Sequence, residues 1–317
     1  MAIRTSAGPA VQSHTEAAAR RERREPSRRS RHGGVPWLLL APYLLFLLVF
    51  GIGPVVGAVW FSFGGGGGRL DGSAFQRVFS SILIGPAARN VAEFLLIFLP
   101  LMLAVTTAAA LVAHSRDDRI GRIARLAYYL PGVVVGAPLV LLWLFMLDPS
   151  LSPFGPMLTA LGQHSTGDVL AAGHLPLIFA IMALFTSVGG WVIVLHGALE
   201  AIDTDVEEAA AIDGCNAWQL ALYVKIPAIR RYLAFIGVLS FAGASQLVAE
   251  PTIIGQAIPG TISSTWSLNQ LGFHYAFAIN DFAAASVVAL ILLAVGALAA
   301  VVLIYGVRGY AVEDGSN

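Results

Sequence analysis

The sequence predicts an all-α integral membrane protein with six membrane-spanning helices, and three observations support this class. Hydrophobic side chains make up 57% of the 317 residues and charged ones 12%, whereas a soluble domain has about 25% charged residues. A soluble fold of this size cannot bury so much apolar surface. Six segments contain no Asp, Glu, Lys or Arg, namely 32–68, 94–115, 126–147, 169–199, 232–249 and 282–307. Each contains a long apolar run, and a membrane helix needs about 20 mostly apolar residues. The expected spans are roughly 36–63, 88–113, 123–147, 174–200, 228–250 and 282–307.

Two other charge-free segments, 149–167 and 251–280, are rich in Pro, Gly and polar residues. This composition favours structured loops near the membrane surface over further spans. For the segment 251–280, an alternative is that part of it re-enters the protein.

The arginines and the single lysine predict the orientation of the chain. With six spans, 16 of the 19 basic residues fall on one side, including eight in the tail 1–34. The positive-inside rule makes that side cytoplasmic and places both termini there. We expect a disordered Arg-rich tail over 1–34, a six-span domain over 35–310 and a short cytoplasmic tail over 311–317.

The residues offer no machinery for catalysis. The only lysine, Lys225, stands between Val224 and Ile226, so the chain lacks the Gly-Lys-Ser/Thr of a phosphate-binding loop. The only cysteine, Cys215, excludes an internal disulfide, and the seven histidines are scattered. We therefore expect a passage or scaffold without a metal site, and not an enzyme.

The loop after the fourth span predicts two short helices joined at a bend. Thr204 with Glu207 fits a capping box, and Gly214 can adopt the left-handed conformation that ends a helix. Asn216 with Gln219 fits a second box. Pro227 suits the first turn of the next span.

This loop presents carboxylates beside small apolar residues. Glu207, Glu208 and Asp213 are expected to be exposed next to alanines, which allow a partner to approach closely while the carboxylates pair with its basic groups. An ordinary amphipathic linker on the membrane surface is the alternative from the residues alone.

The same loop resembles the E-A-A loop of ABC-importer permeases, here residues 203–227. Glu208-Ala209-Ala210 is followed by three residues, Gly214, nine residues and Val224-Lys225-Ile226-Pro227. The spacing matches the family pattern, with Val for Ile and Ile for Leu, while Cys215 replaces a frequent alanine. Further similarity to the carbohydrate-uptake branch, which includes maltose-type and glycerol-3-phosphate permeases, lies in Tyr128-Tyr129-Leu130-Pro131, Pro42-Tyr43 and Arg89-Asn90.

The resemblance implies a type I ABC importer permease, most similar to the first of two permeases in such systems, in the bacterial cytoplasmic membrane. Its expected partners are a second permease, a cytoplasmic ATPase dimer that binds ATP and Mg²⁺, and an outer binding protein for a sugar-type solute. No cofactor is expected in this chain. The loop would dock on the ATPase as a coupling helix, Glu208 pairing with a basic residue and Ala209 and Ala210 making close contact. The implied coupling residues are Glu207, Glu208, Ala209, Ala210, Asp213, Gly214 and Pro227.

Polar residues within spans are costly and usually face the interior. In this family spans 4 and 5 line the path, so the candidate solute residues are Ser187, Trp191, Ser245, Gln246 and Glu250. Structural roles are the alternative: packing for Trp191, backbone bonds for the serines, and an i, i+4 pair for Gln246 and Glu250.

Two other functions remain open. A secondary transporter would need internal repeats or a mid-membrane carboxylate, and we find no convincing repeat. A membrane scaffold would use the 201–227 loop to recruit a different cytoplasmic protein.

Overall fold

The structure is a computed structural model that describes residues 35–64, 71–115, 128 and 130–313. Every regular element in these ranges is helical. The predicted tail 1–34 and the final residues 314–317 lie outside the described part of the chain. The chain divides into two compact units, Met1–Pro54 and Val55–Asn317, and each is described by itself.

The first unit holds most of the predicted first span. Helix α2 (Val35–Phe46) passes into a π-helical turn, η1 (Leu47–Ile52), and the unit ends at Pro54, the second residue of α3 (Gly53–Ser62), most of which belongs to the second unit. The Gly53 N–H donates to the Leu48 carbonyl, five residues back. Pro54 follows, and in a regular α-helix its ring would clash with the carbonyl four residues earlier, so the wider turn lets the helix continue.

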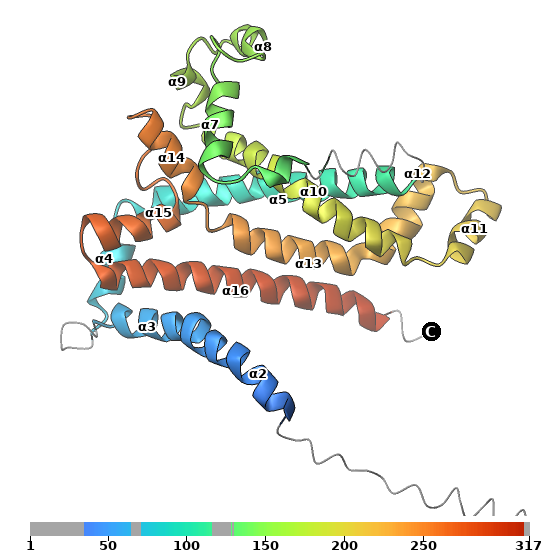
Figure 1. Cartoon of the computed structure of the whole chain (residues 1–317), viewed down its shortest axis with the longest axis horizontal. Coiled ribbons are helices and arrows are strands. Elements are labelled where there is room, and N and C mark those ends of the chain that lie inside the picture. The colour runs from blue at the N-terminus through green and yellow to red at the C-terminus, as the bar shows by residue number, and fades with distance from the viewer. Residues whose placement is uncertain (1–34, 65–70, 116–127, 129, 314–317) are drawn as a thin grey trace, which may run out of the picture. The chain divides into compact units, whose positions relative to one another are not determined.

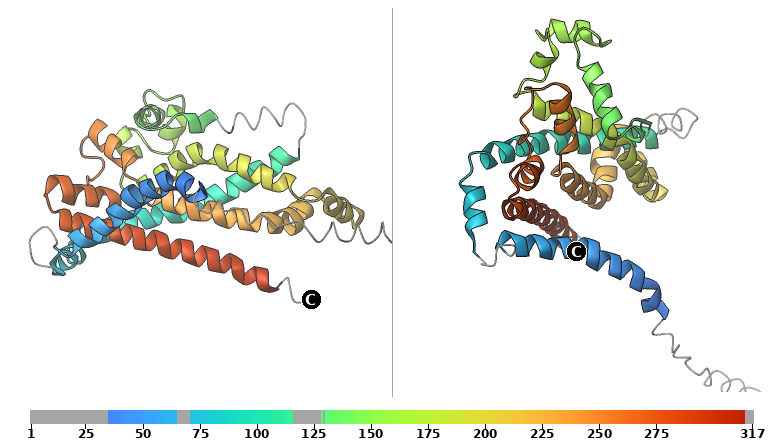
Figure 2. Two further views of the ribbon diagram at one scale, coloured as in Figure 1. Left: turned by 60° about the horizontal axis from the view of Figure 1, so that its bottom comes forward. Right: turned by 60° about the vertical axis from the view of Figure 1, so that its left-hand side comes forward.

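The second unit is built on four long helices: α5 (Ile84–His114), α10 (Leu175–Glu200), α13 (Ile226–Ala244) and α16 (Phe282–Glu313). Helices α5 and α10 pack along each other, and α13 lies beside both and beside α16; Figures 1 and 2 agree on this arrangement. The main core forms where α5, α10 and α13 meet, and it contains Phe94, Met102, Phe179, Leu195 and Ile236.

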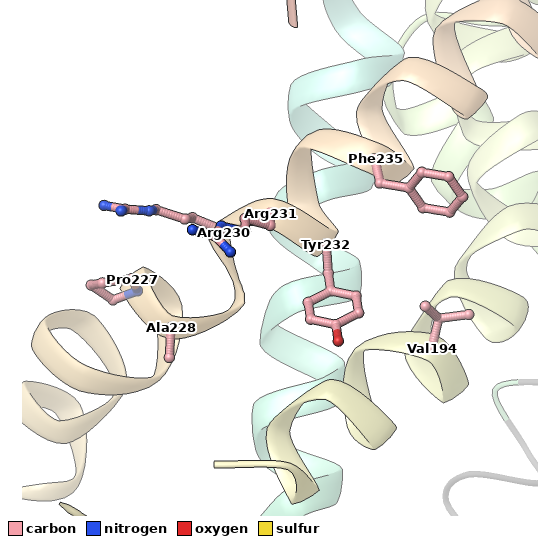
Figure 3. A pocket seen from close by; sticks show the side chains of 7 residues that line it. All are labelled: Val194, Pro227, Ala228, Arg230, Arg231, Tyr232 and Phe235. Carbon is pink, nitrogen blue, oxygen red and sulfur yellow. The ribbon is translucent and has the colours of Figure 1, made fainter. Parts of the chain in front are cut away.

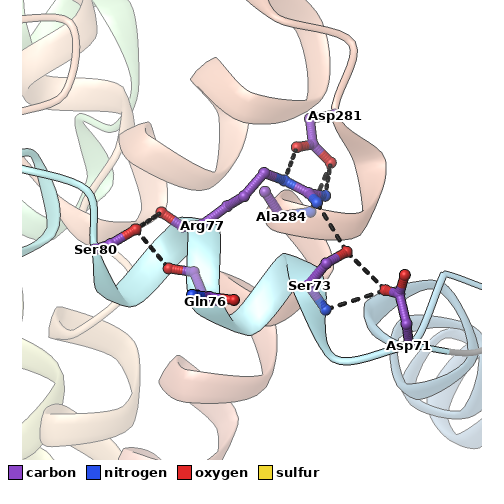
Figure 4. A network of polar contacts seen from close by, with 7 residues as sticks. All are labelled: Asp71, Ser73, Gln76, Arg77, Ser80, Asp281 and Ala284. Carbon is purple, nitrogen blue, oxygen red and sulfur yellow. Dashed lines mark hydrogen bonds and ion pairs between the residues drawn. The ribbon is translucent and has the colours of Figure 1, made fainter.

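A smaller core joins α4 (Ser73–Phe79), α15 (Leu268–Phe273) and the start of α16. A polar network crosses its surface (Figure 4). Arg77 Nε lies 3.0 Å from Asp281 Oδ2, and Asp281 Oδ1 also accepts the Ala284 N–H at the start of α16. Ser73 links Arg77 to Asp71. Two elements about 200 residues apart in the chain are thus held together.

The predicted third span, 123–147, is not a continuous helix in its described part. A 3₁₀ turn, η2 (Leu130–Val133), is separated from α7 (Ala137–Met146) by non-helical residues. Gly136, the residue before α7, has φ +71°, a conformation that glycine adopts readily, and Pro138 suits the beginning of α7. A Cβ on Gly132 would lie 2.8 Å from the Thr186 carbonyl oxygen, so η2 packs its backbone directly against α10.

The predicted fifth span also ends earlier than expected, at Ala244 instead of residue 250. Residues beyond it turn, and a new helix, α14 (Ala249–Ala257), begins. Asn269 Nδ2 donates to the Gln246 carbonyl and Ser267 Oγ to the Leu247 carbonyl. These side chains supply the partners that a continuing helix would have given those two carbonyls, so the break is stabilised by distant residues.

The segment 251–280 is folded into the protein. Besides α14 and α15 it contains the π-helical turn η4 (His274–Ala278), and its Ile254 and Trp266 are buried in the main core. The other predicted loop, 149–167, carries the short helices α8 (Gly155–Ala160) and α9 (Thr166–Val169).

Five helices in the described residues are long and apolar enough to cross a membrane. They correspond to all the predicted spans except the third. The count of six is therefore not confirmed, because α7 is short and residues 116–127 lie outside the described part.

Candidate coupling element and solute cavity

The segment 203–227, here called the coupling element, has the helix–bend–helix form that the sequence predicts. Helix α11 (Thr204–Ile212) is followed by Gly214 at φ +84° and then by α12 (Ala217–Leu220). The Cys215 N–H donates to the Ala210 carbonyl at 3.0 Å and the Gly214 N–H to the Ala211 carbonyl at 3.1 Å. This pair of bonds is a Schellman motif, which depends on the left-handed glycine.

Of the two predicted caps, one is confirmed and one is wrong. Asn216 and Gln219 exchange both bonds of a capping box at 2.9 Å. The cap of α11, however, is Asp203 and not Thr204: Asp203 Oδ1 accepts the Asp205 N–H. Aspartate caps at least as well as threonine, and a cap one residue earlier frees the Glu207 side chain for other contacts.

The second helix of the coupling element does not end before the next span. Helix α12 passes into a π-helical turn, η3 (Ala221–Lys225), and then into α13 without a break. Pro227 lies in the first turn of α13, as expected. The Ile226 N–H donates to Ala221, five residues back, and the wider turn makes room for the proline ring. Sequence periodicity contains no signal for this turn.

The predicted coupling residues point in two directions. Glu208, Ala209 and Asp213 are exposed, but Ala210 is buried and Glu207 is only partly exposed. Because positions 207 and 210 share one side of a helix, α11 has one face against its own protein and one face free. The expectation that Glu207 is exposed was wrong.

Large exposed apolar side chains of the coupling element were not singled out from the sequence. Ile212 is 86%, Trp218 71% and Tyr223 74% exposed. Three such side chains within one short element offer apolar area for a contact. Their mixture with charged residues in a short element hid this signal in the sequence.

Glu207 contacts basic groups from two other elements. Lys225 Nζ lies 2.9 Å from Glu207 Oε2, and His114 Nε2 lies 3.5 Å from Oε1. Burial by itself raises the pKa of Glu207, but the hydrogen bond and charge of Lys225, together with His114, outweigh it and hold the pKa below 4.5. His114 also lies edge-on to the His196 ring.

Four of the five predicted solute residues line a single cavity of about 380 Å³, here called the solute cavity. Ser187 and Trp191 come from α10, Gln246 from the break after α13, and Glu250 from α14. Because the helix ends at Ala244, Gln246 and Glu250 do not form an i, i+4 pair on one helix.

The two predicted serines differ. Ser245 is buried outside this cavity, and its Oγ donates to the Ala242 carbonyl. Ser187 lines the cavity but donates to the Ala183 carbonyl at 2.6 Å. Sequence reasoning missed Ser240, which also lines the cavity and whose buried Oγ has no hydrogen-bond partner among the described residues.

The family follows from comparison with known proteins. Residues 97–308 match the sequence profile of the binding-protein-dependent transport system inner membrane component. The chain belongs to this family. The match contains the whole coupling element and nearly all of the solute cavity. Membership of this family makes the chain, here called the permease, a multi-pass inner membrane protein, and the family is a membrane component of transport systems.

Named relatives of this permease are transport proteins. It is 26% identical over 221 residues to the alpha-glucoside transport system permease protein AglF of Rhizobium meliloti, covering 63% of this chain but only 62% of AglF. It is 28% identical to the diacetylchitobiose uptake system permease protein NgcF of Streptomyces coelicolor, covering 83% of this chain and 77% of NgcF.

A solved structure confirms the fold of the permease. A bacterial ABC transporter involved in the import of the acidic polysaccharide alginate superimposes with a TM-score of 0.74 over 88% of this chain and 96% of that chain. Their sequences are 16% identical, so the likeness concerns the ABC importer permease fold.

A wider hollow of about 790 Å³ lies at the start of α13 in this permease (Figure 3). Arg230 and Arg231 lie to one side of it, and Tyr232 and Phe235 lie towards Val194 of α10. The predicted coupling residue Pro227 also borders it. The hollow thus joins the end of the coupling element to the beginning of the apolar part of α13.

Proposed function

We propose that this permease is one transmembrane subunit of an ATP-driven, binding-protein-dependent importer for a sugar or a related polyol or oligosaccharide. The single observation that carries this proposal is the coupling element, which presents exposed Glu208 and Ala209 on a capped helix with a glycine bend. A cytoplasmic ATPase dimer would bind ATP and Mg²⁺ and dock on this free face.

Electrostatics and apolar contact both favour such a docking. Glu208 can pair with an Arg or Lys of the ATPase, and Ile212 and Trp218 offer exposed apolar area. Ala209 and Gly214 are small and exposed, so they allow close approach. Asp213 adds a second carboxylate beside the bend. Ala210, turned inward, would support the helix from behind.

The solute path would pass through the solute cavity together with a second permease. Trp191 can stack on a sugar ring, and Gln246, Glu250 and Ser240 offer polar groups for hydroxyls. The sugar class is supported by the names of the relatives, which concern alpha-glucosides and diacetylchitobiose. Both termini would be cytoplasmic, since 16 of 19 basic residues then lie inside.

The test is purification of the tagged chain from membranes, followed by transport in vesicles. We expect a second permease and an ATPase to co-purify, and ATP-dependent uptake of a labelled oligosaccharide after reconstitution with the outer binding protein. Glu208→Lys should reduce ATPase co-purification strongly, while the same charge change on α5, Glu93→Lys, should not.

Two outcomes would contradict the proposal. Transport by the purified chain alone would indicate a secondary transporter. Recovery of the chain with a different cytoplasmic protein and no ATPase would indicate a scaffold.

A further inference from the structure

The only lysine of the chain is buried and reaches the coupling element. Lys225 lies in η3, and its side chain is 11% exposed. Its Nζ lies 2.9 Å from Oε2 of Glu207, which is 18 positions earlier in α11. A buried ammonium group is tolerated only when it is paired, so this contact fixes where α11 lies relative to η3.

The other oxygen of the same carboxylate faces a third element. His114 is the last residue of α5, and its Nε2 lies 3.5 Å from Glu207 Oε1. Glu207 is therefore held between the C-terminal end of α5 and the helical run that continues into α13. We call Glu207, Lys225 and His114 the latch.

The two helices that meet the latch also line the solute cavity farther along their length. Phe94 and Phe98 of α5 and Ser240 of α13 border the cavity. At 1.5 Å per residue, Phe98 and His114 are about 24 Å apart along α5, and Lys225 and Ser240 are about 22 Å apart along their run. Figure 1 shows α11 and α14 at opposite ends of α13.

We propose that the latch makes α11 move as one body with α5 and α13, so that displacement of the docked coupling element reaches the solute cavity. This inference rests on the proposed function, because it assigns the step between ATPase docking and the solute path. Between the latch and the solute cavity both helices are packed into the main core, through Met102 and Ala110 of α5 and Ile229 and Ile236 of α13, and such a continuous packed path can carry the displacement.

The latch separates two tasks within α11. Glu207 and Ala210 form the inward side that attaches the helix to its own protein, while neighbouring Glu208 and Ala209 stay exposed for a partner. Glu207 and Glu208 are thus chemically identical neighbours with different roles.

The first experiment uses Cys215, the only cysteine, which is partly buried in the bend beside Gly214. Its alkylation rate is measured at fixed pH for the full chain in membranes. Glu207→Gln and Lys225→Met should each raise the rate about tenfold, because each removes a hydrogen bond to a charged group. The same change on α5, Glu93→Gln, lies outside the coupling element and should leave the rate unchanged.

A double variant tests whether the two residues act on each other. In the double variant Glu207→Gln with Lys225→Met, the alkylation rate of Cys215 should rise less than the product of the two single-variant increases predicts. The reason is that no charge is then left buried without its partner. Equal rates in all variants, or strictly multiplicative effects, would overturn the latch.

The second experiment measures transport in the assembled importer. Glu207→Gln should retain the co-purifying ATPase and its ATP hydrolysis, but uptake per ATP should fall at least threefold. Faster alkylation with unchanged uptake would overturn the transmitting role. Failure of the proposed function would look different: the wild-type chain would bring down no ATPase, whereas the alkylation result needs none.

Discussion

The conformation of Gly214 yields a graded prediction for the coupling element. At φ +84° the residue sits in the left-handed region, and no heavy atom lies within 4 Å of the point that a Cβ would occupy. Substitutions should therefore act through the backbone and not through clashes. The expected damage increases from Gly214→Asn through Gly214→Ala to Gly214→Pro.

The magnitudes follow from the backbone geometry. An L-residue pays about 1–2 kcal/mol in the left-handed region, and the loss of unfolded-state freedom offsets about 0.4–1 kcal/mol for Gly214→Ala. The net cost to the bend at Gly214 is about 1 kcal/mol, which lowers the equilibrium constant for forming this bend roughly fivefold. Asn tolerates this region, so Gly214→Asn should cost less.

Gly214→Pro should be far worse, for two reasons. Proline fixes φ near −65° and has no N–H, whereas the Gly214 N–H donates to the Ala211 carbonyl at 3.1 Å. A cost of about 3 kcal/mol or more corresponds to over a hundredfold.

The assay is the alkylation rate of Cys215 in membranes, measured beside ATP-driven uptake for the same variants. The rate should rise little for Asn, about fivefold for Ala and most for Pro, with uptake falling in the same order. If Gly214→Pro behaves like the wild type, or if Asn and Ala are equally harmful, the left-handed bend does not control the element.

Two further predictions concern the cavity and the latch. Trp191→Ala and Glu250→Gln should each raise the KM for uptake about fivefold, whereas Ser245→Ala, outside the cavity, should not; equal effects of all three would refute the assignment. The lowered pKa of Glu207 means that its contribution to stability is full above 4.5 and is lost as pH falls below that value. The Tm difference between wild type and Glu207→Gln should therefore shrink as the pH is lowered below 4.5, and a constant difference would contradict the ion pair.

Some features of the coupling element and the long helices could be predicted because they depend on nearby residues. Apolar runs locate α5, α10 and α16, and the positive φ of Gly214 and the Asn216 capping box follow from local chemistry. Local sequence chemistry also predicted Thr204 as the cap of α11, and this was wrong. The adjacent Asp203 is the cap, and the Glu207 side chain pairs with Lys225, a distant contact that local chemistry cannot show.

Other features depend on residues far apart in the chain. The break after Ala244 is stabilised by Ser267 and Asn269. The sequence prediction extended that span to 250 because residues 232–249 contain no Asp, Glu, Lys or Arg. The break is nevertheless what brings Gln246 and Glu250 to the solute cavity beside Trp191.

The sequence by itself determined that this is a membrane permease with a capped coupling element, because hydropathy, charge placement and spaced motifs are properties of short segments. Only the tertiary structure decided which carboxylate of the Glu207-Glu208 pair faces inward. That choice depends on His114 and Lys225, which are brought together by the packing of α5 and η3 around α11. A buried charge needs its partner in space, and spacing along the chain cannot supply that partner.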